Sequence, residues 1–112
     1  MRYLLLVYDE GEWESHQSLH VSVDLRTNAR LISSEELQPV ATATTVRVRG
    51  GDTIVADGPF ADTSETLGGY YVIEGESLDE AIEWAAKIPS ARGGTIEVRP
   101  VVQLPAEVEA RP

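Results

Sequence analysis

Residues 3–8 read Tyr-Leu-Leu-Leu-Val-Tyr, an apolar run close to the amino terminus. A strand that is apolar at successive positions is typical of the centre of a sheet, where both of its faces are buried. We therefore expect a central strand here, with helices over one face and a second copy of the chain over the other. The run is too short for a signal sequence or a membrane span, and Asp9 and Glu10 follow it directly.

Gly50-Gly51 is a predicted two-residue turn between two further strand patterns, Val46–Arg49 and Thr53–Ala56. Glycine pairs suit type I′ and II′ hairpin turns, because these turns need positive φ angles. The turn fixes which residues face each other: Arg49 and Asp52, Val48 and Thr53, Val46 and Val55, Thr44 and Asp57. This register places Asp57 on the face of the hairpin that carries the valines.

The second half of the chain contains a predicted helix between two strands. Residues 69–74 and 95–102 have strand patterns, and Pro100 marks the last strand as a sheet edge because proline has no N–H to donate. A capping box at residues 77–80 marks the start of an apolar stripe at helical spacing, and Pro89 follows it. The stripe consists of Leu78, Ala81, Ile82, Ala85 and Ile88. The helix should therefore begin after Ser77 and end before Pro89.

Asp57-Gly58-Pro59-Phe60 forms an abrupt corner at the end of the hairpin. Gly58 can take positive φ and Pro59 fixes φ near about −65°, so the corner holds Asp57 in one orientation. Two roles for Asp57 stay open. Its carboxylate could act as a general base on the apolar face, or it could accept backbone N–H groups in an Asx turn.

The corner and its surroundings resemble the YCII-related family, in the branch named after its DGPF motif. The resemblance runs from Ala41 to Val101 and rests on the segments ATATTVRVR, VADGPFADT, LGGYYVIE, SLDEAIEWAAKIP and IEVRP. It implies an α+β, ferredoxin-like fold of the dimeric α+β barrel type, with a mainly antiparallel sheet and two helices on one face. We expect residues 1–102 to form this single domain and residues 103–112, rich in proline and charge, to form a flexible tail.

Residues 14–27 allow two interpretations. Leu19–Arg26 alternates like a strand, whereas the resemblance implies a helix, and Asp24–Leu31 is similar to the helix end and turn of the family. We favour a shortened helix from about Glu14 to Thr27, with Asn28 as its cap.

Nineteen acidic and nine basic residues give the chain a formal net charge of −10. This charge repels phosphate backbones and anionic membranes, so we expect no direct nucleic-acid or membrane partner. The chain has no cysteine, which excludes disulfides and thiol chemistry and fits a reducing compartment. We therefore expect a cytoplasmic protein that needs no cofactor.

Several side chains could carry chemistry beside Asp57. His20 is the second catalytic candidate, because imidazole titrates near neutral pH and related YCII proteins carry a His-Asp pair thought to be their active site. His16 and His20 have the i, i+4 spacing of metal ligands, but a third ligand is absent from the motif, so we expect no metal site. The predicted ligand-binding residues near the corner are Phe60, Asp62, Thr63 and Tyr70.

Two functions remain open on this basis. The first is a small dimeric binding or regulatory module with a small-molecule ligand. The second is a lyase-like enzyme that uses a carboxylate, with or without a histidine, for acid–base chemistry on a small metabolite. The sequence slightly favours the first, because neither histidine matches the helix register of the DGPF branch.

Overall fold

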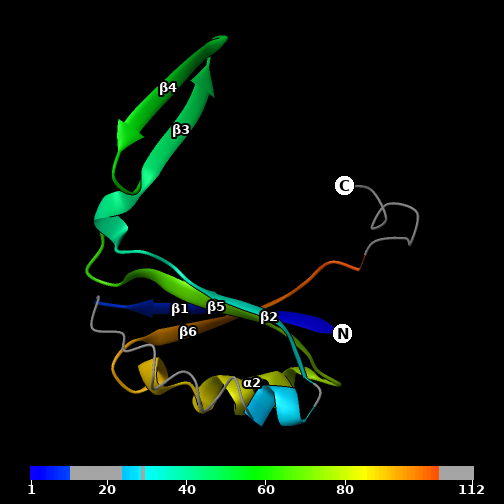
Figure 1. The fold of residues 1–112 in the computed structure, drawn as a ribbon. Helices are drawn as coiled ribbons and strands as arrows, with labels where there is room; N and C mark the ends of the chain where they lie inside the picture. Colours follow the sequence, from blue (N-terminus) through cyan, green and yellow to red (C-terminus); the bar gives the residue numbers. More distant parts are fainter. Residues whose placement is uncertain (11–23, 29, 104–112) are drawn as a thin grey trace.

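A computed structural model describes residues 1–10, 24–28 and 30–103 (Figure 1). Its body is one antiparallel sheet in the order β2-β5-β1-β6. The strands are β1 (Arg2–Asp9), β2 (Leu31–Glu36), β5 (Thr66–Glu74) and β6 (Thr95–Pro100). This order, with helices on one face, is ferredoxin-like, so the predicted α+β fold class is confirmed.

Strand β1 is central, as its apolar run predicts, because it pairs with β5 on one side and β6 on the other. Tyr3, Leu5 and Val7 are buried on the helix face. The alternate residues Leu4, Leu6 and Tyr8 are only half-buried, because none of the helices within the described residues covers their face. The described part of the chain therefore covers one of the two faces of the sheet.

Helix α2 (Leu78–Ala86) begins at the predicted cap: the Ser77 hydroxyl accepts the Glu80 N–H at 3.2 Å. Such a cap contributes about 1 kcal/mol to helix stability. The Glu80 carboxylate in turn accepts the Glu76 N–H at 2.9 Å and pairs with Arg30 at 2.8 Å. The start of α2 is thereby tied to the segment before β2.

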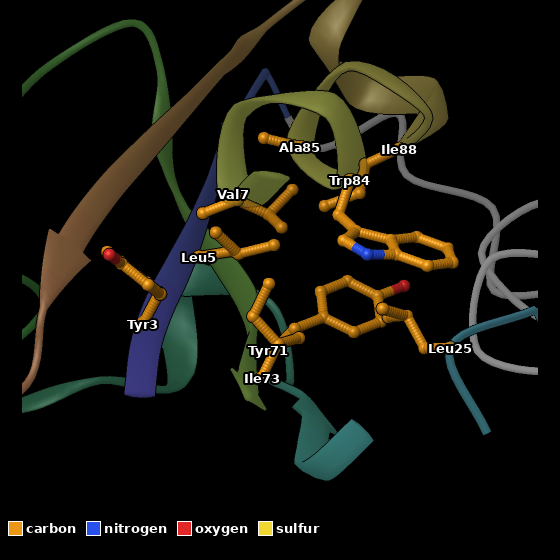
Figure 2. Packing of buried hydrophobic residues seen from close by; sticks show 10 residues of the cluster. Tyr3, Leu5, Val7, Leu25, Tyr71, Ile73, Trp84, Ala85 and Ile88 are labelled. Atoms are coloured by element: carbon orange, nitrogen blue, oxygen red, sulfur yellow. The ribbon is translucent and has the colours of Figure 1, made fainter. Parts of the chain in front are cut away.

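The apolar face of α2 differs in part from the predicted stripe. Leu78 and Ile82 are about half exposed, whereas Trp84 packs beside Tyr71 in the core (Figure 2). The buried stripe of the helix continues to Ile88 and consists of Ala81, Trp84, Ala85 and Ile88, which are spaced i, i+3, i+4, i+7. The chain then passes through the 3-10 turn η2 (Pro89–Ala91) into β6.

The described end of the ambiguous segment is helical. Residues 24–27 are helix, Leu25 is fully buried in the core, and the Asn28 side chain donates to the Asp24 carbonyl at 2.8 Å. The Arg30 N–H donates to the Leu25 carbonyl, a bond typical of a helix end. This end agrees with the helix interpretation. Residues 14–23, and the tail from residue 104, lie outside the described residues.

The structure adds a strand that the sequence analysis missed. Strand β2 pairs with β5, although its sequence Leu-Ile-Ser-Ser-Glu-Glu is mostly polar. An edge strand needs few apolar residues, because one side of it and part of its faces meet water.

None of the helices within the described ranges is long and apolar enough to cross a bilayer.

The predicted hairpin is present, but it forms a separate two-stranded sheet rather than part of the main one. Strands β3 (Thr44–Arg49) and β4 (Asp52–Asp57) pair in the predicted register, with Thr44 opposite Asp57. Gly50 and Gly51 both have positive φ, as the turn requires. We call residues 44–57 the arm, because the hairpin projects from the sheet on the side opposite α2 (Figure 1).

Candidate functional site

The corner at the base of the arm has the rigid geometry that its sequence predicts. Gly58 has φ +95°, a conformation that glycine adopts without strain. Its N–H donates to the Ala43 carbonyl at 2.7 Å, and its carbonyl accepts the Thr45 hydroxyl at 2.7 Å. These two bonds join the outgoing and returning chains and fix where the arm leaves the body.

Asp57 is exposed at this corner. By register it shares a face with Val46 and Val55, but both valines are themselves about 60% exposed. The arm of a single chain therefore leaves the carboxylate in water. The apolar surroundings expected for a general base would have to come from another surface.

A hollow of about 520 Å³ lies beside the corner, and we call it the corner pocket. Three segments build it: the end of β1, the stretch around the 3-10 turn η1 (Val40–Thr42), and the loop that follows Pro59. Its principal apolar side chains are those of Tyr8, Leu37, Val40, Phe60 and Leu67. Its polar side chains belong to Gln38, Thr44, Thr45, Thr63, Glu65 and Thr66.

Two of the four predicted ligand-binding residues line the corner pocket. Phe60 is 77% exposed and forms its wall, rather than filling the core. Thr63 also lines it, and its hydroxyl donates to the Glu65 carbonyl at 2.6 Å, which shapes the loop. Asp62 is exposed and Tyr70 lies half-buried opposite Leu6 on the uncovered sheet face, and neither lines the pocket.

A second hollow of about 320 Å³ adjoins the first, and the two share the lining residues Leu37, Gln38, Val40, Thr63, Thr66 and Leu67. Asp9, at the end of β1, lines this second hollow and is only 8% exposed. The Ser90 hydroxyl lies 3.4 Å from its carboxylate. Among the described residues Asp9 is the one charged residue that is buried.

Asp9 is not among the predicted site residues, although the sequence carries a signal for it. Position 9 continues the alternation of Tyr3, Leu5 and Val7, so its side chain points to the covered face of the sheet. A carboxylate at such a position must be hydrogen-bonded or paired, because burial of an uncompensated charge costs several kcal/mol. A polar residue that falls in register with buried positions is therefore a candidate for function.

His16 and His20 lie outside the described residues, so the structure does not relate them to Asp57 or Asp9. Within residues 1–10, 24–28 and 30–103, no group of three or more histidine or acidic side chains could hold a metal ion. Of the predicted site, the structure thus brings together Phe60 and Thr63 in one pocket, with Asp57 at the neighbouring corner.

Comparison with known proteins gives two findings. A family model described as the YCII-related domain matches residues 1–105. A protein named only as uncharacterized, from Rhizobium meliloti (strain 1021), is 38% identical over 114 residues, which cover 90% of this chain and 92% of that protein.

Proposed function

The chain belongs to the YCII-related family, and from this premise we propose that it is a small dimeric module that binds a small molecule in the corner pocket. The observation that carries the proposal is the pocket itself. Its volume of about 520 Å³ lies within the range of about 300–1,000 Å³ that is usual for ligand sites. A mainly apolar wall with a few hydroxyl and amide groups is also usual for such sites.

The lining indicates the class of ligand. Glu65 is the one carboxylate among the lining residues, and it accepts the Thr95 hydroxyl at 3.0 Å. No lysine or arginine is among the described residues that line the pocket, and the chain carries a net charge of −10. An anionic ligand would meet repulsion without a paired cation. We therefore propose an uncharged, largely apolar molecule with one or two polar groups that the threonines and Gln38 can bind.

Dimerisation is the second part of the proposal. Leu4, Leu6, Tyr8, Tyr70 and Val72 share the sheet face that α2 leaves open, and all are only half-buried. A continuous apolar patch on a small protein usually marks an interface. Light scattering at micromolar concentration should give about twice the chain mass of 12.2 kDa. The cysteine-free sequence supports a cytoplasmic setting for this dimer.

Substitution of Phe60 by alanine should weaken ligand binding. An uncharged apolar fluorophore, N-phenyl-1-naphthylamine, should bind wild-type protein saturably, and Phe60→Ala should raise its Kd about tenfold, because buried aromatic side chains dominate binding energy. Ile82→Ala is a matched control, since Ile82 is an exposed apolar residue on α2, away from the pocket. Equal Kd values for wild type and Phe60→Ala would refute the corner pocket as the binding site.

Asp9 favours a second candidate function, a lyase-like enzyme. A buried carboxylate beside a hydroxyl, on the wall of a hollow next to an apolar pocket, can exchange a proton with a bound metabolite. Asp57 and His20 remain the other candidates for acid–base chemistry. In this function the corner pocket would orient the substrate and one of the carboxylates would take its proton.

The enzyme function predicts proton exchange with solvent. Small uncharged cyclic metabolites incubated with the protein in D₂O should lose the NMR signal of an acidic C–H, and the Asp9→Asn variant should slow this loss about 100-fold or more with its Tm retained. Asp57→Asn tests the second carboxylate in the same way. Glu83→Gln, an exposed carboxylate on α2, is the control. Exchange that no Asp9 or Asp57 variant slows would exclude both carboxylates as the base.

A further inference from the structure

We propose that the arm is an exchange element: the valine face of the arm in one copy packs on the body of a second copy, over the sheet face that α2 leaves open. This inference rests on the homodimer proposed above and specifies how the dimer is held together. The sheet face that receives the arm belongs to a second copy of this chain, and each copy packs its arm on the other.

The arm lacks a packing partner within the described part of its own chain. Strands β3 and β4 make extensive contact only with each other, and all their residues except Thr45 are exposed. An isolated two-stranded hairpin is at best marginally stable in water. A regular hairpin with fixed register, standing away from the body as in Figure 1, therefore needs a surface to pack against.

One face of the arm has the composition of such a contact surface. Val46 lies opposite Val55, and Val48 lies on the same face one pair further along. These three valines are 60%, 62% and 60% exposed, and Phe60, just beyond the arm, is 77% exposed. Small proteins rarely expose a contiguous patch of apolar side chains unless another protein covers it.

The complementary surface is on the same chain. Leu4 lies opposite Val72 and Leu6 opposite Tyr70, so these four side chains form one apolar patch on the open face of the sheet. The arm rises from this side of the molecule, and α2 lies on the other (Figure 1). When two copies are related by a two-fold axis, each arm can cover the open sheet face of the other copy. The contact then closes, because neither copy is left with an unoccupied contact surface.

The size of the arm sets the area of the exchange contact. Six-residue strands in pairs give the arm a face of roughly 20 by 10 Å, and four strands give the open sheet face roughly 20 by 20 Å. In a reciprocal exchange each copy thus buries roughly 200 Å² of its arm and roughly 200 Å² of its sheet face, roughly 400 Å² of flat area in all. The accessible area of pleated surfaces that carry side chains is larger than this flat area, which places the contact below the roughly 800 Å² per partner of a standard-size interface.

The charge distribution also favours a second copy. The arm contains two arginines, Arg47 and Arg49, and two aspartates, Asp52 and Asp57, so it is neutral, whereas the whole chain carries −10. Two acidic bodies repel each other, but a neutral arm can approach an acidic body without that penalty.

Charge placed on the valine face should break the dimer. Light scattering of Val55→Asp, at a concentration where wild type gives about twice 12.2 kDa, should give the mass of one chain, with its circular dichroism spectrum retained. Ile54→Asp is the matched control: Ile54 is 49% exposed and adjacent, but on the opposite face of the arm. It should remain dimeric. A Val55→Asp variant that stays as dimeric as Ile54→Asp would overturn the arm contact while leaving a dimer in place.

Cross-linking tests the placement directly, because the chain has no cysteine of its own. Val55→Cys protein mixed with tagged Tyr70→Cys protein and a short bis-maleimide should give a cross-linked pair of the two variants. Ile54→Cys protein, mixed with the same Tyr70→Cys protein and cross-linker, should give little of the cross-linked pair. Absence of the Val55–Tyr70 product in a proven dimer refutes the exchange, and a monomeric wild type refutes exchange and dimer together. Binding of N-phenyl-1-naphthylamine to the corner pocket is measured separately and can survive either result.

Discussion

Replacement of Gly94 by alanine should destabilise the protein by about 3 kcal/mol or more, the largest effect that we expect from adding one methyl group. A β-carbon at this position would collide with the Tyr8 carbonyl oxygen and would lie 3.0 Å from the Ser90 carbonyl oxygen. Both obstacles are backbone atoms of packed elements, so neither can move aside as a flexible side chain would. Urea unfolding measures the loss as a fall in the free energy of unfolding.

The neighbouring glycine supplies the control. A β-carbon on Gly93 would meet no atom within 4 Å, so Gly93→Ala should change stability by less than about 1 kcal/mol and can even stabilise by restricting the unfolded chain. Equal effects of the two substitutions would mean that β6 does not approach β1 as closely as the structure shows.

Gly94 also has a functional consequence. It allows the turn that carries Ser90 to lie against the end of β1, where the Ser90 hydroxyl meets Asp9. A Gly94→Ala variant that still folds should therefore shift the wall of the second hollow. If the protein is the lyase-like enzyme, the Gly94→Ala variant should lose activity, as the Asp9→Asn variant should.

Leu5→Ala should cost about 2–5 kcal/mol of folding stability. Leu5 is fully buried on the helix face of β1, within the cluster that Figure 2 shows, and its truncation leaves a cavity that rigid neighbours cannot fill. Thermal or urea unfolding gives the difference, measured at one fixed protein concentration because a dimer's stability depends on it.

Leu6→Ala distinguishes the two faces of the same strand. Leu6 is half-buried on the open face, so its truncation should reduce the folding stability of one chain by less than that of Leu5. It should instead weaken self-association, seen as a lower mass by light scattering on dilution. If Leu6→Ala left the dimer as tight as wild type at every dilution, the open face would not be the interface.

Two of the four ligand-binding residues predicted from the sequence line the candidate site. Phe60 and Thr63 line the corner pocket, and both follow closely on the corner that Gly58 and Pro59 form, which the local sequence makes predictable. Asp62 and Tyr70 do not line it, since alternation along a loop or strand shows which residues share a face but not which face borders a cavity. Asp9 was overlooked for the same reason: its pocket is built by segments that are remote in sequence.

The sequence by itself determined the features that depend on neighbouring residues. The cap at Ser77 follows from side-chain and backbone groups three residues apart, and the register of the hairpin follows from the two glycines of its turn. The central place of β1 agrees with its apolar run, because apolar residues at successive positions are typical of a strand at the centre of a sheet, with pairing strands on both sides.

Only the tertiary structure decided which strands share a sheet. Polar β2 joins the body because β5 offers it a free edge, and the more apolar hairpin stays apart because β5 pairs with β1 and β2 instead. Such pairings depend on the competition between distant segments for the same backbone groups, which local patterns do not encode. The same competition leaves the arm and the open sheet face uncovered, and it thereby creates both the corner pocket and the surface proposed to receive a second copy.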